Sequence, residues 1–214
     1  AKEVLVIGGG DGGTVREILK HPSVERVVLC EIDGEVIDIC KRYFPKIAGK
    51  LDDPRVDIQV RDGVAYIAEQ ENRFDVVMID STDPMGPGTG LFTVDFYRDV
   101  AKSLKPGGIV TAQTESPNIE AEGFQRIYAN LKQVFPIVTA YWGVVPTYPG
   151  AMWSWAYCSF DTPPLLHLNE AKARPIAETC QYYNHGVHLG AFALPNFVRA
   201  MVDNPAVEAV PAPC

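Results

Sequence analysis

Two acidic motifs carry side chains of the types and spacing that could do chemistry. The first, Gly8-Gly9-Gly10-Asp11-Gly12-Gly13, follows the apolar residues 4–7, and the second, Asp80-Ser81-Thr82-Asp83-Pro84, follows the apolar residues 76–79. Each apolar run is typical of a buried strand, so each motif places carboxylates just beyond the carboxyl end of a strand, where open parallel sheets bind ligands. An aspartate within a glycine turn would repel a phosphate. The sequence therefore predicts a site for a positively charged ligand.

Asp80 and Asp83 form the part of this site that could move a proton. Because Asp80 comes directly after an apolar strand, we expect its carboxylate to be partly desolvated and its pKa to be raised. Asp83, three residues further on, should raise that pKa again through like-charge coupling. Such a pair could bind an ammonium group and then accept its proton. The alternative for Asp83 is a helix N-cap, with Pro84 at the first helical position.

Two further acidic residues follow predicted strands and suit a nucleoside. Glu31 ends the second strand, 21 residues after Gly10, which is the spacing at which an acidic residue accepts hydrogen bonds from ribose hydroxyls. Asp62-Gly63 ends the third strand, where such folds usually meet an adenine. The glycine turn alone fits any nucleoside or dinucleotide site. A solvated strand end for Glu31 and a plain turn for Asp62 are the structural alternatives.

The elements that must position these residues alternate along the chain. Strand patterns cover residues 4–7, 27–30, 57–60, 75–79 and 109–113, and helical patterns cover residues 14–20, 34–44, 64–69, 91–104 and 120–134. Lys105-Pro106-Gly107-Gly108 is a helix stop signal. This alternation predicts an α/β fold, a Rossmann-like doubly wound sheet with right-handed crossovers. Strands at 138–145 and 152–159 are joined by a short connection and must pair as a C-terminal antiparallel hairpin.

Composition favours a cytoplasmic globular protein without a nucleic-acid or membrane partner. The 214 residues are 47% hydrophobic, which suffices for one large domain. The net charge of −8 argues against a nucleic-acid surface, and no apolar run approaches the roughly 20 residues that span a bilayer. The five cysteines are scattered without a CxxC pair, so neither zinc nor a disulfide framework is indicated. His185 and His188 are expected to pack or hydrogen-bond rather than hold a metal.

The chain ends in a segment of different composition. Residues 203–214 (DNPAVEAVPAPC) are rich in proline and alanine and lack periodicity. We expect this tail to be disordered. The predicted catalytic domain therefore covers residues 1–202.

Six motifs in order carry a family resemblance. They are GGGDGG (8–13), Glu31-Ile32-Asp33, Asp62-Gly63, DSTDPMGP (80–87), Gln113-Thr114-Glu115 and PTYP (146–149). Together they resemble spermidine synthases, the polyamine aminopropyltransferases, over residues 3–160, and residues 182–195 resemble the C-terminal end of bacterial members. The predicted sheet with its hairpin likewise resembles that of S-adenosylmethionine-dependent methyltransferases.

The resemblance implies an activity and a set of site residues. The family moves the aminopropyl group of decarboxylated S-adenosylmethionine to a diamine, usually putrescine, giving spermidine and methylthioadenosine without a metal or a permanently bound cofactor. Asp80 would be the catalytic base, and residues 84–91 would form a loop that closes over the substrates. The nucleoside co-substrate would be bound by Gly8, Gly10, Asp11, Cys30, Glu31, Ile32, Asp62, Gly63 and Asp80. The diamine would be bound by Asp11, Asp80, Asp83, Gln113 and Tyr148.

Several alternatives stay open at this point. The acceptor could be cadaverine, agmatine or spermidine instead of putrescine. A methyltransferase that uses intact S-adenosylmethionine fits the fold and Glu31, although its carboxylate would be repelled by Asp11. A core that binds a nucleoside or a polyamine without turnover is the third alternative. The resemblance also implies a homodimer or homotetramer, and a small N-terminal β domain of the family that these residues do not include.

Overall fold

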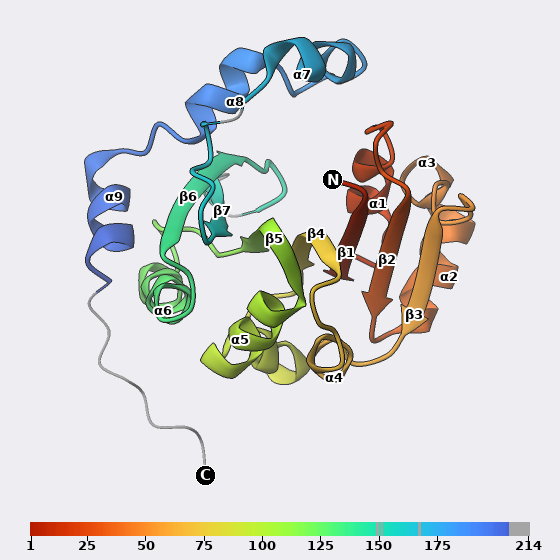
Figure 1. Ribbon diagram of the computed structural model, residues 1–214, viewed down its shortest axis with the longest axis horizontal. Helices are drawn as coiled ribbons and strands as arrows, with labels where there is room; N and C mark the ends of the chain where they lie inside the picture. Colours follow the sequence, from red (N-terminus) through yellow and green to blue (C-terminus); the bar gives the residue numbers. More distant parts are fainter. Residues whose placement is uncertain (149, 151, 167, 206–214) are drawn as a thin grey trace. The chain divides into compact units, whose positions relative to one another are not determined.

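The computed structural model describes residues 1–148, 150, 152–166 and 168–205, and the chain divides into two units, Ala1–Ala112 and Gln113–Cys214 (Figure 1). Parallel strands form the sheet of the first unit in the order β3-β2-β1-β4-β5. Gly8 at the end of β1 lies opposite Asp80 at the end of β4. The register therefore brings both acidic motifs to one edge, as predicted. The strands are β1 (Glu3–Gly8), β2 (Arg26–Glu31), β3 (Val56–Val60), β4 (Phe74–Asp80) and β5 (Leu104–Gln113).

Helices cover both faces of this sheet, which confirms the doubly wound α/β fold. Apolar side chains of α1 (Gly13–Ile18), α2 (Gly34–Tyr43) and α3 (Pro45–Ala48) share a buried core with β1 and β2. Figure 1 shows α4 (Gly63–Ala68) and α5 (Val94–Ser103) side by side on the other face. Successive residues of a strand point to opposite faces, so β1 contributes Val4 and Val6 to the first core and buries Leu5 and Ile7 on the second.

Two boundaries in the first unit differ from the sequence predictions. The Lys105–Gly108 stop signal lies within β5, because α5 already ends at Ser103 and Leu104 pairs with Phe74. The register then shifts, so that Ile109 pairs with Val76 and the intervening residues bulge. Helix α1 ends at Ile18, earlier than predicted.

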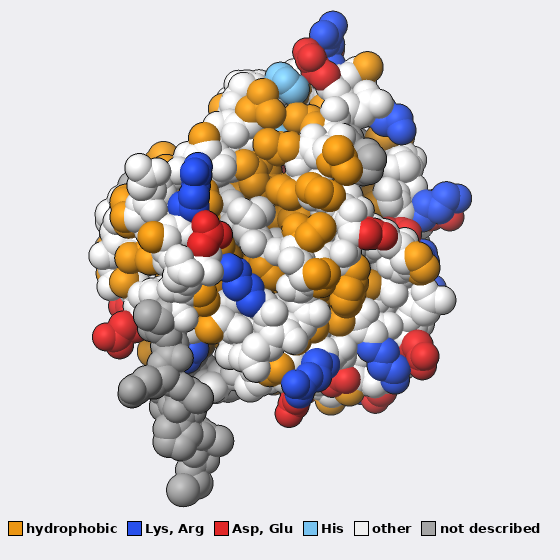
Figure 2. Space-filling view, turned by 60° about the vertical axis from the view of Figure 1, so that its left-hand side comes forward, with side chains coloured by type: hydrophobic (Ala, Val, Ile, Leu, Met, Phe, Trp, Pro, Cys, Tyr) orange, Lys and Arg blue, Asp and Glu red, His pale blue; other side chains and the backbone are white. Residues whose placement is uncertain are grey.

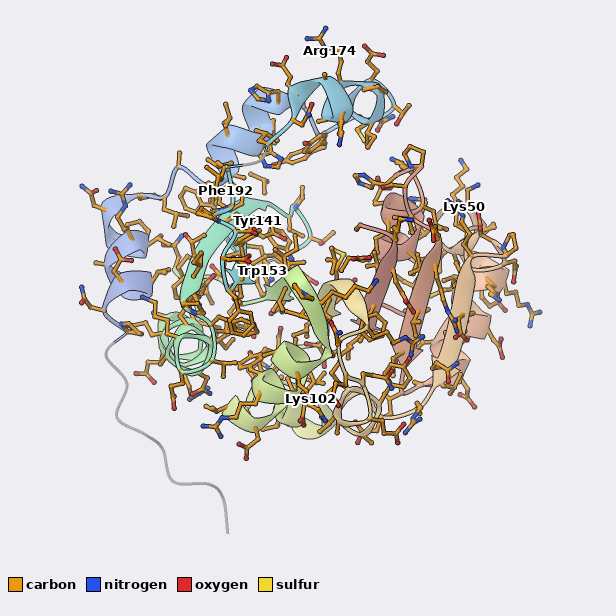
Figure 3. The ribbon with its side chains drawn as sticks, viewed as in Figure 1. Lys50, Lys102, Tyr141, Trp153, Arg174 and Phe192 are labelled. Atoms are coloured by element: carbon orange, nitrogen blue, oxygen red, sulfur yellow. The ribbon has the colours of Figure 1, made fainter. Side chains whose placement is uncertain are left out.

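The second unit contains the predicted antiparallel hairpin. Strands β6 (Ile137–Val144) and β7 (Met152–Ser159) pair antiparallel, preceded by α6 (Ala121–Lys132). On this hairpin Tyr141 stacks on Trp155 with ring centroids 5.6 Å apart and contacts Phe192, which Figure 3 labels. Large apolar side chains of this unit, Tyr182 and Leu166 among them, are exposed, and Figure 2 shows hydrophobic side chains on the face it presents. An exposed apolar side chain does not by itself identify a ligand site.

Short helices beyond those predicted from the sequence follow the hairpin. They are α7 (Glu170–Ala177), α8 (His185–Ala191) and α9 (Asn196–Asp203). In α8 the predicted hydrogen-bonding role of His188 is confirmed, because its Nδ1 lies 3.0 Å from the Tyr183 hydroxyl. The predicted tail begins where α9 ends, and its residues 206–214 lie outside the described part of the chain. Among the described helices, none has the length and apolar character needed to cross a membrane.

Candidate active site

The glycine turn after β1 is shaped by the carboxylates around it. Gly8 and Gly9 have φ of 80° and 67°, in the left-handed region that favours glycine. A Cβ on Gly8 would collide with the carbonyl oxygen of Asp80, and a Cβ on Gly9 would lie 2.8 Å from Asp80 Oδ2. On Gly10 it would lie 2.9 Å from Glu31 Oε2. The glycines are therefore required for the approach of Asp80 and Glu31, before any ligand is considered.

Asp80 is held at the end of β4 by a threonine from α1. The Thr14 hydroxyl donates a hydrogen bond of 2.5 Å to Oδ2 of Asp80. Burial raises the pKa of Asp80, the negative charges of Asp11 and Glu31 raise it further, and the Thr14 hydrogen bond lowers it. The predicted raised pKa is confirmed. The charges that raise this pKa are those of Asp11 and Glu31, which lie at or just after the ends of the first two strands, and coupling to Asp83 stays a prediction.

Glu31 ties two loops of the site together. Its Oε2 accepts a hydrogen bond from the Gly10 N–H and its Oε1 accepts one from the Asp33 N–H, both 3.0 Å long. The alternative that Glu31 is only a solvated strand end is therefore wrong. A carboxylate oxygen has more than one lone pair, so each oxygen keeps capacity for a ribose hydroxyl. That role stays a prediction.

Asp62 and Gly63 begin helix α4. Asp62 is the N-cap, and its Oδ1 accepts a hydrogen bond of 2.8 Å from the Val64 N–H. Gly63 is buried, and a Cβ there would lie 2.5 Å from Ile7 Cγ2. Both residues thus have local structural reasons to be present, and their contact with an adenine stays a prediction.

Cys30 and Ile32 flank Glu31 in opposite environments. Cys30 is 1% exposed and its thiol donates to the Arg61 carbonyl, and burial raises the pKa of this thiol to about 12. It is a neutral packing residue here. Ile32 is 58% exposed beside the same edge. Of the two, Ile32 has the apolar surface that a nucleoside base could contact.

Asp11 lies in the same cavity as Asp80. Its Oδ1 accepts a hydrogen bond of 2.8 Å from the Gly13 N–H, which fixes the side chain over the start of α1. A cavity of about 520 Å³ is lined by Asp11, Thr14 and Asp80, by apolar side chains of Ile18 and Met78, and by the polar residues Arg16, Glu17 and His21. The Arg16 guanidinium is paired with Glu17, so the carboxylates of Asp11 and Asp80 are the groups of this cavity that suit an alkylammonium group.

Asp83 lies three residues before a 3₁₀ helix. Its carbonyl oxygen accepts a hydrogen bond of 2.6 Å from the Met85 N–H. The 3₁₀ helix η1 (Gly86–Phe92) follows, with Met85 as its N-cap, so the alternative that Asp83 caps a helix is wrong. Residues 84–91 therefore form mainly a helical turn, and their closing over substrates stays a prediction.

Gln113 and Tyr148 belong to the second unit. Gln113 is buried, and its Oε1 accepts a hydrogen bond of 3.3 Å from the Glu115 N–H. Tyr148 is about half exposed and packs against Trp153, with ring centroids 4.3 Å apart. Pro149, the end of the PTYP motif, lies outside the described residues. Binding of a diamine by Gln113 and Tyr148 stays a prediction.

The sequence interpretation misses Thr14 and the conformation of Glu115. It places Thr14 only in a helix, although a hydroxyl in the first turn after a glycine loop can reach the neighbouring strand end. Glu115 is 3% exposed with φ of 72°. Its carbonyl oxygen accepts a 2.6 Å hydrogen bond from the Ser154 hydroxyl. Left-handed φ is typical of glycine and asparagine, so nothing in the sequence indicates it for a glutamate.

These residues can bind a cation and accept a proton from it. Asp80 is a carboxylate of raised pKa in a cavity shared with Asp11, and a general base works best when its pKa approaches the working pH. No group of three or more His, Cys, Asp or Glu in the described ranges is arranged to hold a metal ion.

The chain is similar to a group of bacterial enzymes. The model of the spermine/spermidine synthase domain matches residues 1–170. The polyamine aminopropyltransferase of Thermoanaerobacter pseudethanolicus is 49% identical over 204 residues, which are 94% of this chain and 72% of the relative. That of Bacillus subtilis is 47% identical over 201 residues, with the same coverage.

Two solved structures that are similar to this chain are also spermidine synthases. A spermidine synthase in complex with the transition-state analogue AdoDATO superposes with a TM-score of 0.91 at 43% identity, covering 94% of this chain and 69% of that one. The spermidine synthase from Thermotoga maritima superposes with a TM-score of 0.89 at 42% identity, covering 94% and 68%.

Proposed function

Because this chain belongs to the spermine/spermidine synthase family and is a polyamine aminopropyltransferase, we propose that its reaction transfers the aminopropyl group of decarboxylated S-adenosylmethionine to putrescine. The products are spermidine and methylthioadenosine. We also propose a cytoplasmic location and a homodimer or homotetramer, on the resemblance alone.

The observation that carries the proposal is the environment of Asp80. A protonated alkylamine, with a pKa near 10 in water, is not a nucleophile until it loses a proton. Asp80, a carboxylate of raised pKa in a cavity that it shares with Asp11, can take that proton. The amine nitrogen then attacks the methylene carbon attached to the sulfonium, and the C–S bond breaks to release the thioether. Because the sulfonium is already an activated electrophile, the remaining requirement is alignment of nitrogen, carbon and sulfur.

Asp11 supplies a reason for the decarboxylated form of the co-substrate. Intact S-adenosylmethionine carries a carboxylate where the decarboxylated form has hydrogen. At an effective dielectric of ~20, two like charges ~5 Å apart repel by roughly 3 kcal/mol. Asp11→Asn should therefore lower the ratio of the dissociation constant of the intact form to that of the decarboxylated form, while weakening the latter. Calorimetry with both ligands measures this ratio, and an unchanged ratio would show that Asp11 is not the selectivity element.

An amine panel tests the proposed reaction. Putrescine, cadaverine, agmatine and spermidine are each supplied with decarboxylated S-adenosylmethionine, and methylthioadenosine release is measured. We expect the highest kcat/KM with putrescine. Asp80→Asn should lower turnover by about 10²–10⁴-fold and leave methylthioadenosine affinity within a few-fold. The control is Asp38→Asn, which removes an exposed carboxylate of α2 and should leave turnover unchanged.

Three other outcomes would contradict parts of the proposed reaction. A better acceptor among the other amines would replace putrescine. Methyl transfer from intact S-adenosylmethionine without release of methylthioadenosine would favour the methyltransferase alternative. Turnover of Asp80→Asn within about threefold of wild type would remove Asp80 as the base.

A further inference from the structure

We infer that Thr14 is a positioning residue that holds one oxygen of the Asp80 carboxylate against the glycine turn and presents the other oxygen to the attacking amine. The inference rests on the proposed function, because it takes Asp80 as the group that accepts the proton. It adds a residue of α1, which the sequence motifs did not single out, to the machinery of the reaction.

The geometry separates the two oxygens of Asp80. Oδ2 accepts the 2.5 Å hydrogen bond from Thr14 Oγ1 and is also the atom that a Cβ on Gly9 would meet at 2.8 Å. Within the described part of the chain, the side-chain hydrogen bonds of Asp80 involve Oδ2 and not Oδ1. An oxygen that already accepts a short hydrogen bond from a hydroxyl is the weaker acceptor for a new proton. Oδ1 is therefore the oxygen available to the amine.

The position of Thr14 in the fold makes this contact rigid. Thr14 is the second residue of α1, directly after the turn whose glycines touch Asp80. Its branched side chain has few χ1 states in a helix, and Gly8, at the start of the same turn, is the register partner of Asp80. The donor and the acceptor are thus both fixed by backbone structure, and Thr14 can set the direction of the carboxylate.

The Thr14 hydroxyl also affects the pKa of Asp80. Burial and the negative charges of Asp11 and Glu31 disfavour the ionised carboxylate, whereas the Thr14 hydrogen bond favours it. Arg16, Glu17 and His21 line the same cavity, and all three are unchanged in the variants compared below. A base must be ionised before it can accept a proton. Removing the hydroxyl should therefore raise the pKa of Asp80, so that the variant loses its base at a higher pH than the wild type does.

The test compares Thr14→Val, which removes the hydroxyl at nearly constant shape, with Thr14→Ser, which keeps it. For Thr14→Val we expect the rising limb of the pH profile of kcat/KM for the amine to move up by about one pH unit. We expect kcat at pH 8 to fall on the order of tenfold because the carboxylate is less well directed. Thr14→Ser should follow the wild-type profile. Thr179→Val is the matched control, since it removes a threonine hydroxyl that, among the described residues, donates to the Ile176 carbonyl in α7.

A titration without turnover keeps this inference separate from the proposed function. The Asp80 carboxyl carbon is followed by NMR in the substrate-free protein, with Asp80→Asn for assignment. A higher pKa in Thr14→Val, and also in Thr14→Ala should the valine variant fold poorly, supports the inference even if no amine is accepted. An unchanged pKa in both variants, or an equal rise in Thr14→Ser, overturns it and leaves the proposed reaction standing.

Discussion

Asp80 carries its negative charge in surroundings that disfavour it. Burial and two neighbouring carboxylates raise its pKa above the ordinary value for aspartate. A carboxyl whose pKa is higher in the folded than in the unfolded protein favours the folded state while it is protonated. Its contribution to stability is fully present below the unfolded-state pKa and is lost as the pH rises through the folded-state pKa. The ionised base is therefore a cost to stability that the site retains for its chemistry.

Asp80→Asn should consequently stabilise the protein while it removes activity. Because the pKa of Asp80 is raised in the folded protein, the gain in free energy of unfolding should be larger at pH 8, where the carboxyl is ionised, than at an acidic pH where it is protonated. Urea denaturation of both proteins at the two pH values measures this difference. A gain that is equal at both pH values would mean that the charge of Asp80 is not the cause.

Glu31→Gln should weaken nucleoside binding. Both oxygens of Glu31 accept backbone N–H groups, so a glutamine must turn its NH₂ towards one of those donors. We expect a loss of affinity for methylthioadenosine of about 1–3 kcal/mol, measured by calorimetric titration. Glu35→Gln, an exposed residue of the first turn of α2, is the control and should bind as wild type. Equal affinity in all three proteins would limit Glu31 to a structural role.

At the residue scale, the identity of the site residues can be predicted from the sequence. The residues that contact them in the fold are harder to predict. The raised pKa of Asp80 could be predicted because the apolar residues that desolvate it precede it directly. The charges of Asp11 and Glu31 reach Asp80 from other strands, so proximity in the sequence does not identify them. Thr14 is 66 residues from Asp80 in the chain, and such a contact depends on the strand register.

The glycine turn is the element on which the site depends most. Gly9→Ala should lower the free energy of unfolding by about 1–2 kcal/mol, because alanine is disfavoured at positive φ. It should also lower turnover strongly, because the new methyl group displaces Oδ2 of Asp80. Gly107→Ala is the matched control, since Gly107 has φ of 76° and a methyl group there would meet no atom of the described residues within 4 Å apart from its chain neighbours.

Denaturation and methylthioadenosine release, measured on both variants, separate the two effects. We expect similar destabilisation but a loss of activity in Gly9→Ala alone. If Gly107→Ala were equally inactive, the loss would come from lower stability and not from contact with Asp80.

Element types were largely predictable because periodicity and turn signals agree in the first unit. The exceptions have local causes. The proline and glycines at 105–108 are typical of a helix end, but a strand can hold them where its register shifts. Helix α3 has four residues, little more than one turn, which is too short for a clear apolar period.

At the scale of the whole molecule, the net charge of −8 favours the approach of a dicationic amine. Salt screens charges over about 10 Å at 0.1 M and about 3 Å at 1 M. Raising the ionic strength from about 0.05 M to about 0.5 M should therefore raise KM for putrescine several-fold while kcat changes little. Steady-state kinetics at constant pH checks this, with the circular dichroism spectrum as the control for folding. A KM independent of salt would mean that short-range contacts alone select the amine.

The hydrogen bond between Glu31 and the Gly10 N–H has a thermodynamic consequence. Fixing one residue of backbone costs roughly 1–2 kcal/mol of conformational entropy, and glycine loses more freedom than any other residue. Since both partners of this bond belong to the chain itself, that entropy is lost when the protein folds and not when the co-substrate arrives. The turn should therefore be ordered before the nucleoside binds. The free energy of binding should then lack the entropy cost of ordering that a flexible loop would add.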